Sequence, residues 1–239
     1  MNHLYPDFNY EKYIELNPYL LFKNLKTKED YEKNYIDEGR YKGRPYKEEM
    51  KENKSFHLLL PTIGKPSIFK MLYSLKNQLL ESDYLTIVYD GSKNISTLDD
   101  VKRATEQFKC KVNIIVENEN LGFWGHAIRN KYNNLEGDFI FHIDDDDILL
   151  DNAMNTIRKI CKDTRMIYIF KIILENNKIV WRKKDIIHAE ISTQSGIIPM
   201  QINKTGFWEL KYGGDFDFYK NLKNQNHVLF IDKITYQKF

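Results

Sequence analysis

Four consecutive carboxylates, Asp144 to Asp147, directly follow the apolar segment DFIFHI. Adjacent carboxylates repel one another, and the repulsion grows where water is excluded, so this run needs a compensating cation. Mg²⁺ and Mn²⁺ prefer carboxylate oxygens and commonly bridge them to the phosphates of a substrate. A solvated turn that caps the next helix is the alternative interpretation. The position at the end of an apolar segment favours a divalent-metal site.

A glycine-containing segment, NENLGFWGHAIRN, occupies residues 118–130. Gly122 and Gly125 would let a ligand approach the backbone, and the helix expected next would present free N–H groups to an anion. Arg129 could pair with a phosphate or with the acidic run, and a structural ion pair is the alternative. Phe123 and Trp124, between the glycines, are predicted to be packing residues, and the alternative is that one of them lines the ligand pocket.

Two further carboxylates, Asp215 and Asp217, follow a pair of glycines in the segment YGGDFDFYKNL. A lone carboxylate at the start of a helix is commonly a cap. A transfer reaction at a metal–phosphate site, however, also needs a general base. Either carboxylate is a candidate for that base.

Alternating strands and helices are predicted from residue 55 onward to position these groups. Short, nearly all-apolar runs predict buried strands at 56–63, 85–90, 111–118 and 138–143. Helices are predicted between them at 66–80, 97–108 and 124–133, with another at 151–161. This alternation is typical of βαβ units and a mostly parallel sheet, in which ligands bind at the carboxyl ends of the strands. Asp90 and the four-Asp run are both expected there.

The remainder of the chain shows less regular patterns. Residues 166–184 predict a hairpin with a turn at Asn176-Asn177, and further strands are predicted in 191–202 and 227–236. Residues 1–54 predict two or three short helices followed by a charged linker. We therefore expect two domains, a small helical module at 1–54 and an α/β domain at 55–239.

The composition limits the class of protein. The chain has 239 residues with 36 Lys and Arg against 34 Asp and Glu, and its net charge of +2 is too small for a general nucleic-acid binder. Cys110 and Cys161 have no metal-ligand spacing and fit a reducing compartment. No apolar run approaches the ~20 residues that cross a bilayer. We expect a cytoplasmic protein with no transmembrane segment and no nucleic-acid partner.

Five segments, in the order PTIGKPS, IVYDGS, NLGFWGHAIRN, FIFHIDDDD and GGDFDF, resemble the motifs of GT-A fold glycosyltransferases, nearest to the family 2-like inverting enzymes. The resemblance covers about residues 56–239. It implies a Rossmann-like α/β fold with a mixed, mostly parallel sheet flanked by helices. The segment NPYL…YIDEGRYKGRPY in turn resembles small helical modules found beside glycosyltransferases.

The resemblance implies a site for a nucleotide-diphosphate sugar, with a UDP-sugar favoured. The resemblance also implies a bound Mn²⁺ or Mg²⁺, with Asp146 of the D-x-D motif as its ligand. Asp144 and Asp147 are alternatives, because four adjacent Asp residues leave the alignment of the motif open. Two departures from the family pattern are Tyr89, which replaces the first Asp of Asp-Asp-Gly-Ser, and an extra Ile128 before Arg129. The residues implied to bind the donor are Pro61, Thr62, Asp90, Asn120, Gly122, Arg129, Asp144 and Asp145.

The catalytic base of the family belongs to a Glu-Asp dyad, which falls on Gly214-Asp215. Asp215 is therefore the expected base and Asp217 the fallback. The implied reaction is metal-dependent sugar transfer, with inversion, to a glycan or other hydroxyl acceptor. Acceptor-side candidates are Trp181, Gln194 and Trp208.

Three other functions stay open at this point. A retaining glycosyltransferase would carry the same D-x-D motif. A sugar-1-phosphate nucleotidyltransferase has a similar strand–helix order, but PTIGKPS offers one Gly and one Lys where a Gly-rich basic loop is needed. A sugar-binding module without catalysis is the non-enzyme alternative, and the retained Asp215 argues against it.

Overall fold

The computed structural model describes residues 5–50 and 52–239. Contacts divide the chain into two compact units, one of Met1–Lys54 with Ile157–Asp163 and one of Ser55–Thr156 with Thr164–Phe239. Residues 157–163, which the predicted boundary at residue 54 places in the α/β domain, group with the N-terminal residues. The predicted division into domains at 1–54 and 55–239 therefore stays a prediction. Residue 51 of the predicted linker and residues 1–4 lie outside the described residues.

The smaller unit has an aromatic core. Tyr13, Tyr35 and Tyr46 are at most 1% exposed, and Tyr35 meets the other two rings edge-on. The Asn9 side chain caps the first helix, and Thr27 with Asp30 forms a capping box on the second. The helices are α1 (Tyr10–Leu16), η1 (Pro18–Phe22), α2 (Lys28–Asn34), η2 (Tyr35–Gly39), η3 (Arg40–Lys42) and η4 (Glu48–Met50).

In the described part of the larger unit, nine strands form one mixed sheet in the order β3-β2-β1-β4-β8-β6-β9-β5, with β7 paired to β6. Strands β3, β2, β1 and β4 are parallel neighbours, and β6 and β9 are parallel to each other. The strands are β1 (Phe56–Thr62), β2 (Tyr84–Tyr89), β3 (Lys111–Val116), β4 (Phe139–His142), β5 (Ile148–Leu149), β6 (Met166–Ile173), β7 (Ile179–Val180), β8 (Gly196–Pro199) and β9 (His227–Gln237). The predicted mixed α/β fold is confirmed.

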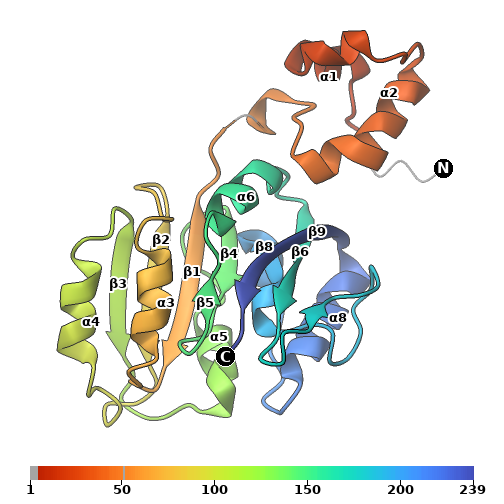
Figure 1. Ribbon diagram of the computed structural model, residues 1–239. Coiled ribbons are helices and arrows are strands. Elements are labelled where there is room, and N and C mark those ends of the chain that lie inside the picture. The colour runs from red at the N-terminus through yellow and green to blue at the C-terminus, as the bar shows by residue number, and fades with distance from the viewer. Residues whose placement is uncertain (1–4, 51) are drawn as a thin grey trace. The chain divides into compact units, whose positions relative to one another are not determined.

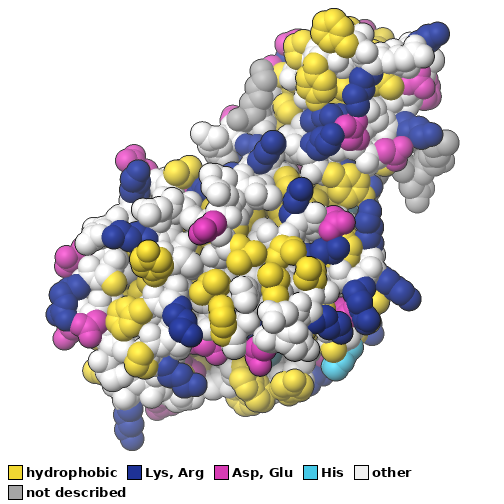
Figure 2. Space-filling model, in the orientation of Figure 1, with side chains coloured by type: hydrophobic (Ala, Val, Ile, Leu, Met, Phe, Trp, Pro, Cys, Tyr) yellow, Lys and Arg dark blue, Asp and Glu magenta, His cyan; other side chains and the backbone are white. Residues whose placement is uncertain are grey.

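Helices flank this sheet (Figure 1). Residues of α5 and α8 pack with strand residues such as Leu59 and Ile140 in one buried cluster, which Trp208 joins. The helical elements are α3 (Ile68–Leu75), α4 (Leu98–Thr105), η5 (Phe123–Gly125), α5 (His126–Lys131), α6 (Ala153–Ile160), η6 (Thr193–Ser195), α7 (Met200–Asn203) and α8 (Gly214–Gln225). On the face of this unit seen in Figure 2, Lys and Arg side chains are mixed with Asp and Glu.

The structure corrects several predicted elements. The predicted strand over 191–202 is a short 3-10 turn, the four-residue strand β8 and helix α7. The predicted helix over 66–80 is shorter, because α3 ends at Leu75. The hairpin forms as predicted from β6 and β7. Strand β5 is too short to be recognised from an apolar pattern.

Candidate active site

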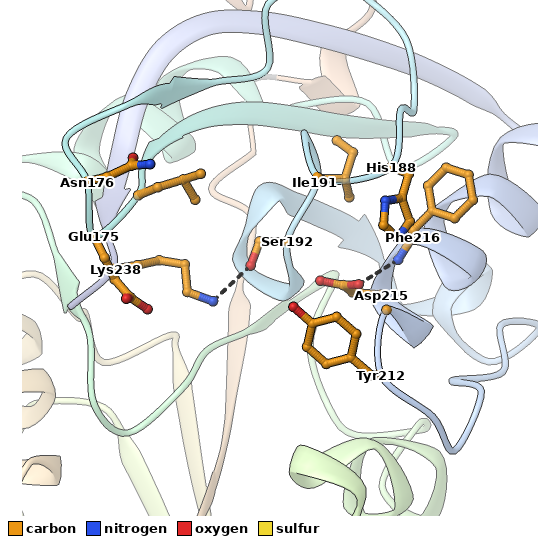
Figure 3. A pocket seen from close by; sticks show the side chains of 12 residues that line it. Glu175, Asn176, His188, Ile191, Ser192, Tyr212, Asp215, Phe216 and Lys238 are labelled. Carbon is orange, nitrogen blue, oxygen red and sulfur yellow. Dashed lines mark hydrogen bonds between the residues drawn. The ribbon is translucent and has the colours of Figure 1, made fainter.

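Three adjoining cavities lie where the parallel strands end. We call them the strand-end cavity (about 310 Å³), the central cavity (about 240 Å³) and the outer cavity (about 430 Å³; Figure 3). The strand-end and central cavities share Trp124, Asp144 and Asp146. The central and outer cavities share Glu175, Tyr212, Gly213, Asp215 and Lys238.

All eight residues predicted to bind the donor line the strand-end cavity. They are Pro61, Thr62, Asp90, Asn120, Gly122, Arg129, Asp144 and Asp145. Seven of them come from the ends of β1, β2 and β4 or from the loop after β3, which the parallel arrangement of these strands brings to one edge, and Arg129 comes from α5. The structure thus supports the predicted clustering, while the role of each residue stays a prediction.

Asp90 fixes the loop that follows β3. Its carboxylate oxygens accept the backbone N–H groups of Leu121 at 2.6 Å and Gly122 at 3.0 Å. The residue is 3% exposed, and its own N–H donates to the carbonyl of Thr62 at 2.8 Å. Charge-assisted bonds of this kind are stronger than neutral ones, so Asp90 ties the loop to the ends of β1 and β2.

Arg129 is buried under the site with 0% exposure. It donates to the carbonyls of Trp124 at 2.9 Å and Ile143 at 3.1 Å, and to Asp144 Oδ1 at 2.5 Å. Its guanidinium also lies 5.4 Å from the centre of the Trp208 ring. Arg129 therefore pairs with the acidic run, which is one of the partners predicted for it from the sequence.

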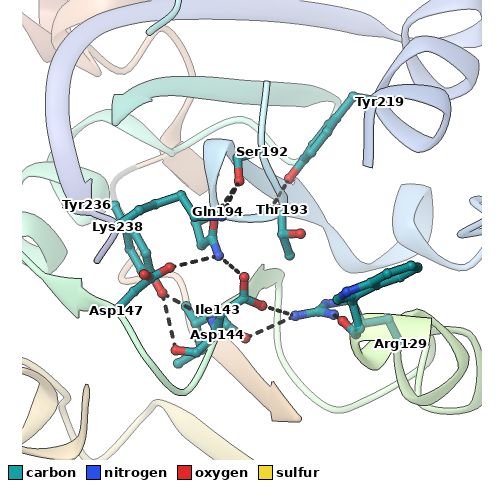
Figure 4. Close-up of polar contacts among 11 residues, drawn as sticks. Arg129, Ile143, Asp144, Asp147, Ser192, Thr193, Gln194, Tyr219, Tyr236 and Lys238 are labelled. Carbon is teal, nitrogen blue, oxygen red and sulfur yellow. Dashed lines mark hydrogen bonds and ion pairs between the residues drawn. The ribbon is translucent and has the colours of Figure 1, made fainter. Parts of the chain in front are cut away.

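The four aspartates have different environments, and Figure 4 shows those of Asp144 and Asp147. Asp144 accepts from Arg129 and from Gln194, and Asp145 accepts from the Thr62 hydroxyl at 2.5 Å. Asp147 is fully buried, where Gln194 donates to it at 3.2 Å and the Phe239 N–H at 3.0 Å. Asp146 is exposed at the mouth shared by two cavities.

Three carboxyls of the acidic run, those of Asp145, Asp146 and Asp147, have raised pKa values. Burial, reinforced by the neighbouring Asp144, raises the pKa of Asp147 to about 7 and also raises the pKa of Asp146. Burial raises the pKa of Asp145, and the hydrogen bond from Thr62 opposes that shift. A cation that enters the site would therefore gain from relieving this repulsion.

The acidic run offers a small set of ligands for a divalent metal. Within 5–50 and 52–239, no group of three or more His, Cys, Asp and Glu side chains lies close enough to hold an ion. Mg²⁺ and Mn²⁺ do not need such a group, because one or two carboxylates with substrate phosphates and waters suffice. Asp146, exposed and beside Asp144, fits that mode of binding.

Asp215 stands at the first turn of α8, where it reaches the central and outer cavities. It is half-buried and accepts the N–H of Phe216 at 2.8 Å. Burial raises the pKa of Asp215, while the Phe216 N–H, His126 and Lys238 each oppose the shift. Asp217 instead forms an ion pair with Lys211 at 2.7 Å. Asp215 is the carboxylate that faces the acidic run.

The three acceptor-side candidates are all buried. Trp181 is 4% exposed and packs edge-on against Phe230, and Trp208 is 1% exposed and stacked on Phe218 at 3.9 Å. Gln194 is 1% exposed, and its amide N–H groups are engaged by the acidic run. Burial of these three side chains does not favour a direct contact with an acceptor, and their role stays a prediction.

Tyr212 and Lys238, which line the central cavity, were not predicted, and Trp124 was named only as an alternative pocket residue. Trp124 is 67% exposed and Tyr212 83% exposed, so the prediction that Trp124 is a packing residue is wrong. Lys238 follows β9 and donates to the Ser192 hydroxyl at 3.2 Å. Pairing of β9 with β6 places Lys238 here, and no local sequence signal indicates that pairing.

A mixed sheet with these residues gathered at the strand ends is typical of the GT-A class of glycosyltransferase. The glycosyl transferase family 2 profile matches residues 60–225, and the chain belongs to this family. No curated protein matches the chain in a separate comparison.

Solved structures show the same fold at low sequence identity. S. aureus TarS 1-349 is 18% identical with a TM-score of 0.60, over 77% of this chain and 60% of that chain. TarS 1-349 in complex with UDP-GlcNAc gives a TM-score of 0.58 at 18% identity, over 77% of this chain and 58% of that one. Mannosyltransferase PcManGT from Pyrobaculum calidifontis, in complex with GDP-Man and Mn²⁺, is 14% identical with a TM-score of 0.59, over 95% of this chain and 67% of that chain.

The chain thus spans 60% or less of the TarS chains. No helix among the described residues is long and apolar enough to cross a membrane.

Proposed function

We propose that this protein transfers a sugar, with inversion, from a nucleotide-diphosphate sugar to a hydroxyl of a glycan or another acceptor in a metal-dependent reaction. The observation that carries the proposal is the central cavity, which brings Asp144 and Asp146 together with Asp215. Family 2 membership and neighbours that bind UDP-GlcNAc or GDP-Man support a nucleotide-sugar donor.

The donor would occupy the strand-end cavity. Asp90 and the loop it fixes form one wall, and Asp145, held by Thr62, forms another. Asp145 would accept a hydroxyl of the ribose or the sugar. We favour a UDP-sugar, because the Asp90 carboxylate suits the N–H of a pyrimidine base such as uracil.

Asp146 would hold Mn²⁺ or Mg²⁺, with Asp144 or Asp147 as the alternative ligand. The ion, when bound, would supply positive charge that stabilises the diphosphate leaving group. The mannosyltransferase neighbour, which was solved with Mn²⁺, supports this choice of metal.

Asp215 would act as the general base. Its carboxylate takes the proton of the acceptor hydroxyl while the hydroxyl oxygen bonds to the anomeric carbon, and the bond from that carbon to the diphosphate oxygen breaks. The outer cavity is also lined by Asp215, and it shares no lining residue with the strand-end cavity. An acceptor in the outer cavity would have its hydroxyl beside Asp215, as inversion with a single general base requires.

Asp146→Asn should reduce metal-dependent donor binding. In a thermal-shift screen, wild-type protein with UDP-GlcNAc or GDP-mannose should melt at a higher temperature when Mn²⁺ is added, because a bound ligand stabilises the folded state by mass action. We expect Asp146→Asn to lose most of that Mn²⁺-dependent increase. Asp138→Asn, a carboxylate at the start of β4 that accepts from Ser55, is the control. An unchanged Mn²⁺ response in Asp146→Asn would contradict the assignment.

The rate of transfer should depend on pH through Asp215. Because burial raises the pKa of Asp215, its carboxyl stays protonated to a higher pH than an ordinary Asp, for which the pKa is about 3.9. A protonated carboxyl cannot accept a proton, so kcat should rise with pH along an acid limb whose midpoint lies above that value. Donor affinity measured over the same pH range separates chemistry from binding. A flat kcat between pH 4 and 8 with unchanged donor affinity would argue against Asp215 as the base.

A further inference from the structure

The loop between Gly122 and Gly125 has an unusual backbone. Its four residues all have positive φ, at 70° for Gly122, 56° for Phe123, 52° for Trp124 and 79° for Gly125. Glycine adopts such angles readily, whereas a bulky aromatic residue does so at a cost in free energy. Backbone strain of this kind persists only where the surrounding structure enforces it, and it concentrates at ligand sites.

The loop is fixed on both sides of the strained residues. On one side Asp90 accepts the N–H of Gly122 at 3.0 Å, and on the other Arg129 donates to the carbonyl of Trp124 at 2.9 Å. Both anchoring side chains are buried. The backbone at Trp124 is therefore held by buried charged contacts, while its ring is 67% exposed.

The Trp124 ring stands between the strand-end and central cavities and lines both. It meets Tyr212 edge-on, with ring centres 6.0 Å apart. Tyr212 is 83% exposed and lines the central and outer cavities. Two large, solvent-exposed aromatic rings thus line the central cavity together with Asp144, Asp146 and Asp215.

We propose that Trp124 and Tyr212 form a sugar subsite, in which the Trp124 ring packs against the pyranose ring of the donor and Tyr212 braces Trp124. This inference rests on the proposed function, because it assigns the position of the sugar in the same site. The C–H bonds on one face of a pyranose carry a slight positive charge, and the face of an indole ring is negative. An exposed tryptophan beside carboxylates therefore offers both the apolar and the hydrogen-bonding contacts that a sugar needs.

The test compares the sugar nucleotide with the nucleotide alone. Dissociation constants would be measured by calorimetry for UDP and UDP-GlcNAc, and for GDP and GDP-mannose, each with Mn²⁺. Trp124→Ala should weaken binding of each sugar nucleotide about tenfold relative to binding of the corresponding nucleoside diphosphate. A factor of about ten is the upper end of what one aromatic contact contributes to affinity. Binding of the nucleotide alone should change less than about twofold. Tyr212→Ala, at a highly exposed position, should produce a smaller loss of about threefold in the same ratio.

Phe123→Ala is the matched control. Phe123 has the same positive φ in the same loop and is 46% exposed, but it lines none of the three cavities. Phe123→Ala should leave the ratio of the two dissociation constants unchanged. Trp124→Phe, which keeps an aromatic ring, should retain most of the preference for the sugar nucleotide.

Two negative results have different meanings. If Trp124→Ala and Tyr212→Ala weaken nucleotide and sugar nucleotide equally, or leave both unchanged, the sugar subsite is wrong while the proposed function stands. If the wild-type protein binds none of the four ligands, the proposed function fails and the subsite fails with it.

Discussion

Asp215→Asn is expected to lower the rate of sugar transfer by about 10²–10⁴-fold, the contribution typical of a positioned general base. Asparagine has nearly the same shape as aspartate but cannot take up the proton of the acceptor hydroxyl. The carboxylate of Asp215 reaches the cavity that Asp144 and Asp146 also line, so its loss removes the base without removing the metal ligand. Donor affinity should therefore stay within a few-fold of the wild-type value.

Asp217→Asn is the matched control for this prediction. Asp217 lies two residues further along α8, but an ion pair with Lys211 at 2.7 Å engages its carboxylate. Its replacement should change the rate less than about threefold. Release of the nucleoside diphosphate in the presence of acceptor measures the rate, and calorimetry measures donor affinity. Near-normal turnover by Asp215→Asn together with a large loss in Asp217→Asn would move the base to the fallback residue.

The position before Asp215 accounts for the absence of a second carboxylate beside it. A Cβ atom on Gly214 would lie 2.3 Å from the carbonyl oxygen of Glu209 and 2.9 Å from the His126 ring. His126 is itself held by a hydrogen bond of 2.8 Å between its Nδ1 and the same carbonyl. There is no room for the glutamate of the family dyad, so a dyad cannot form without moving this contact.

The strand-end residues could be predicted from sequence because their signals are local. An apolar run that ends in carboxylates identifies both a buried strand and its carboxyl edge, as at Asp90 and Asp144. Parallel pairing then brings these edges together, and no further information is needed to predict that the residues cluster.

The remaining wall of the site depends on contacts between distant segments. Gln194 contacts Asp144 and Asp147 across about 50 residues of chain, and Lys238 enters through the pairing of β9 with β6. Aromatic residues were the least predictable, because their type favours burial and exposure alike. Trp208 is buried, whereas Trp124 is exposed by a backbone conformation that its sequence neighbours do not reveal.

Arg129→Met is expected to destabilise the protein by about 3–5 kcal/mol, because it breaks a buried ion pair and removes the Arg129 donor from the carbonyls of Trp124 and Ile143. The guanidinium satisfies Asp144 and the carbonyls of Trp124 and Ile143 at once. Methionine is similar in length and apolar, so the loss would report these polar contacts more than a cavity. For a chain of this size the melting temperature should fall by on the order of 10 °C.

Arg103→Met provides the comparison that isolates burial. Arg103 also pairs with an aspartate, Asp100, but the two side chains are 69% and 55% exposed. Water screens such a pair, so its removal should cost less than about 1 kcal/mol. Urea denaturation of both variants gives the two free energies of unfolding. Equal losses in the two variants would mean that Arg129 does not organise the site. A large loss of unfolding free energy confined to Arg129→Met would support Arg129 as the residue that fixes both the acidic run and the strained loop bearing Trp124. Stability and donor binding would then depend on the same buried charge.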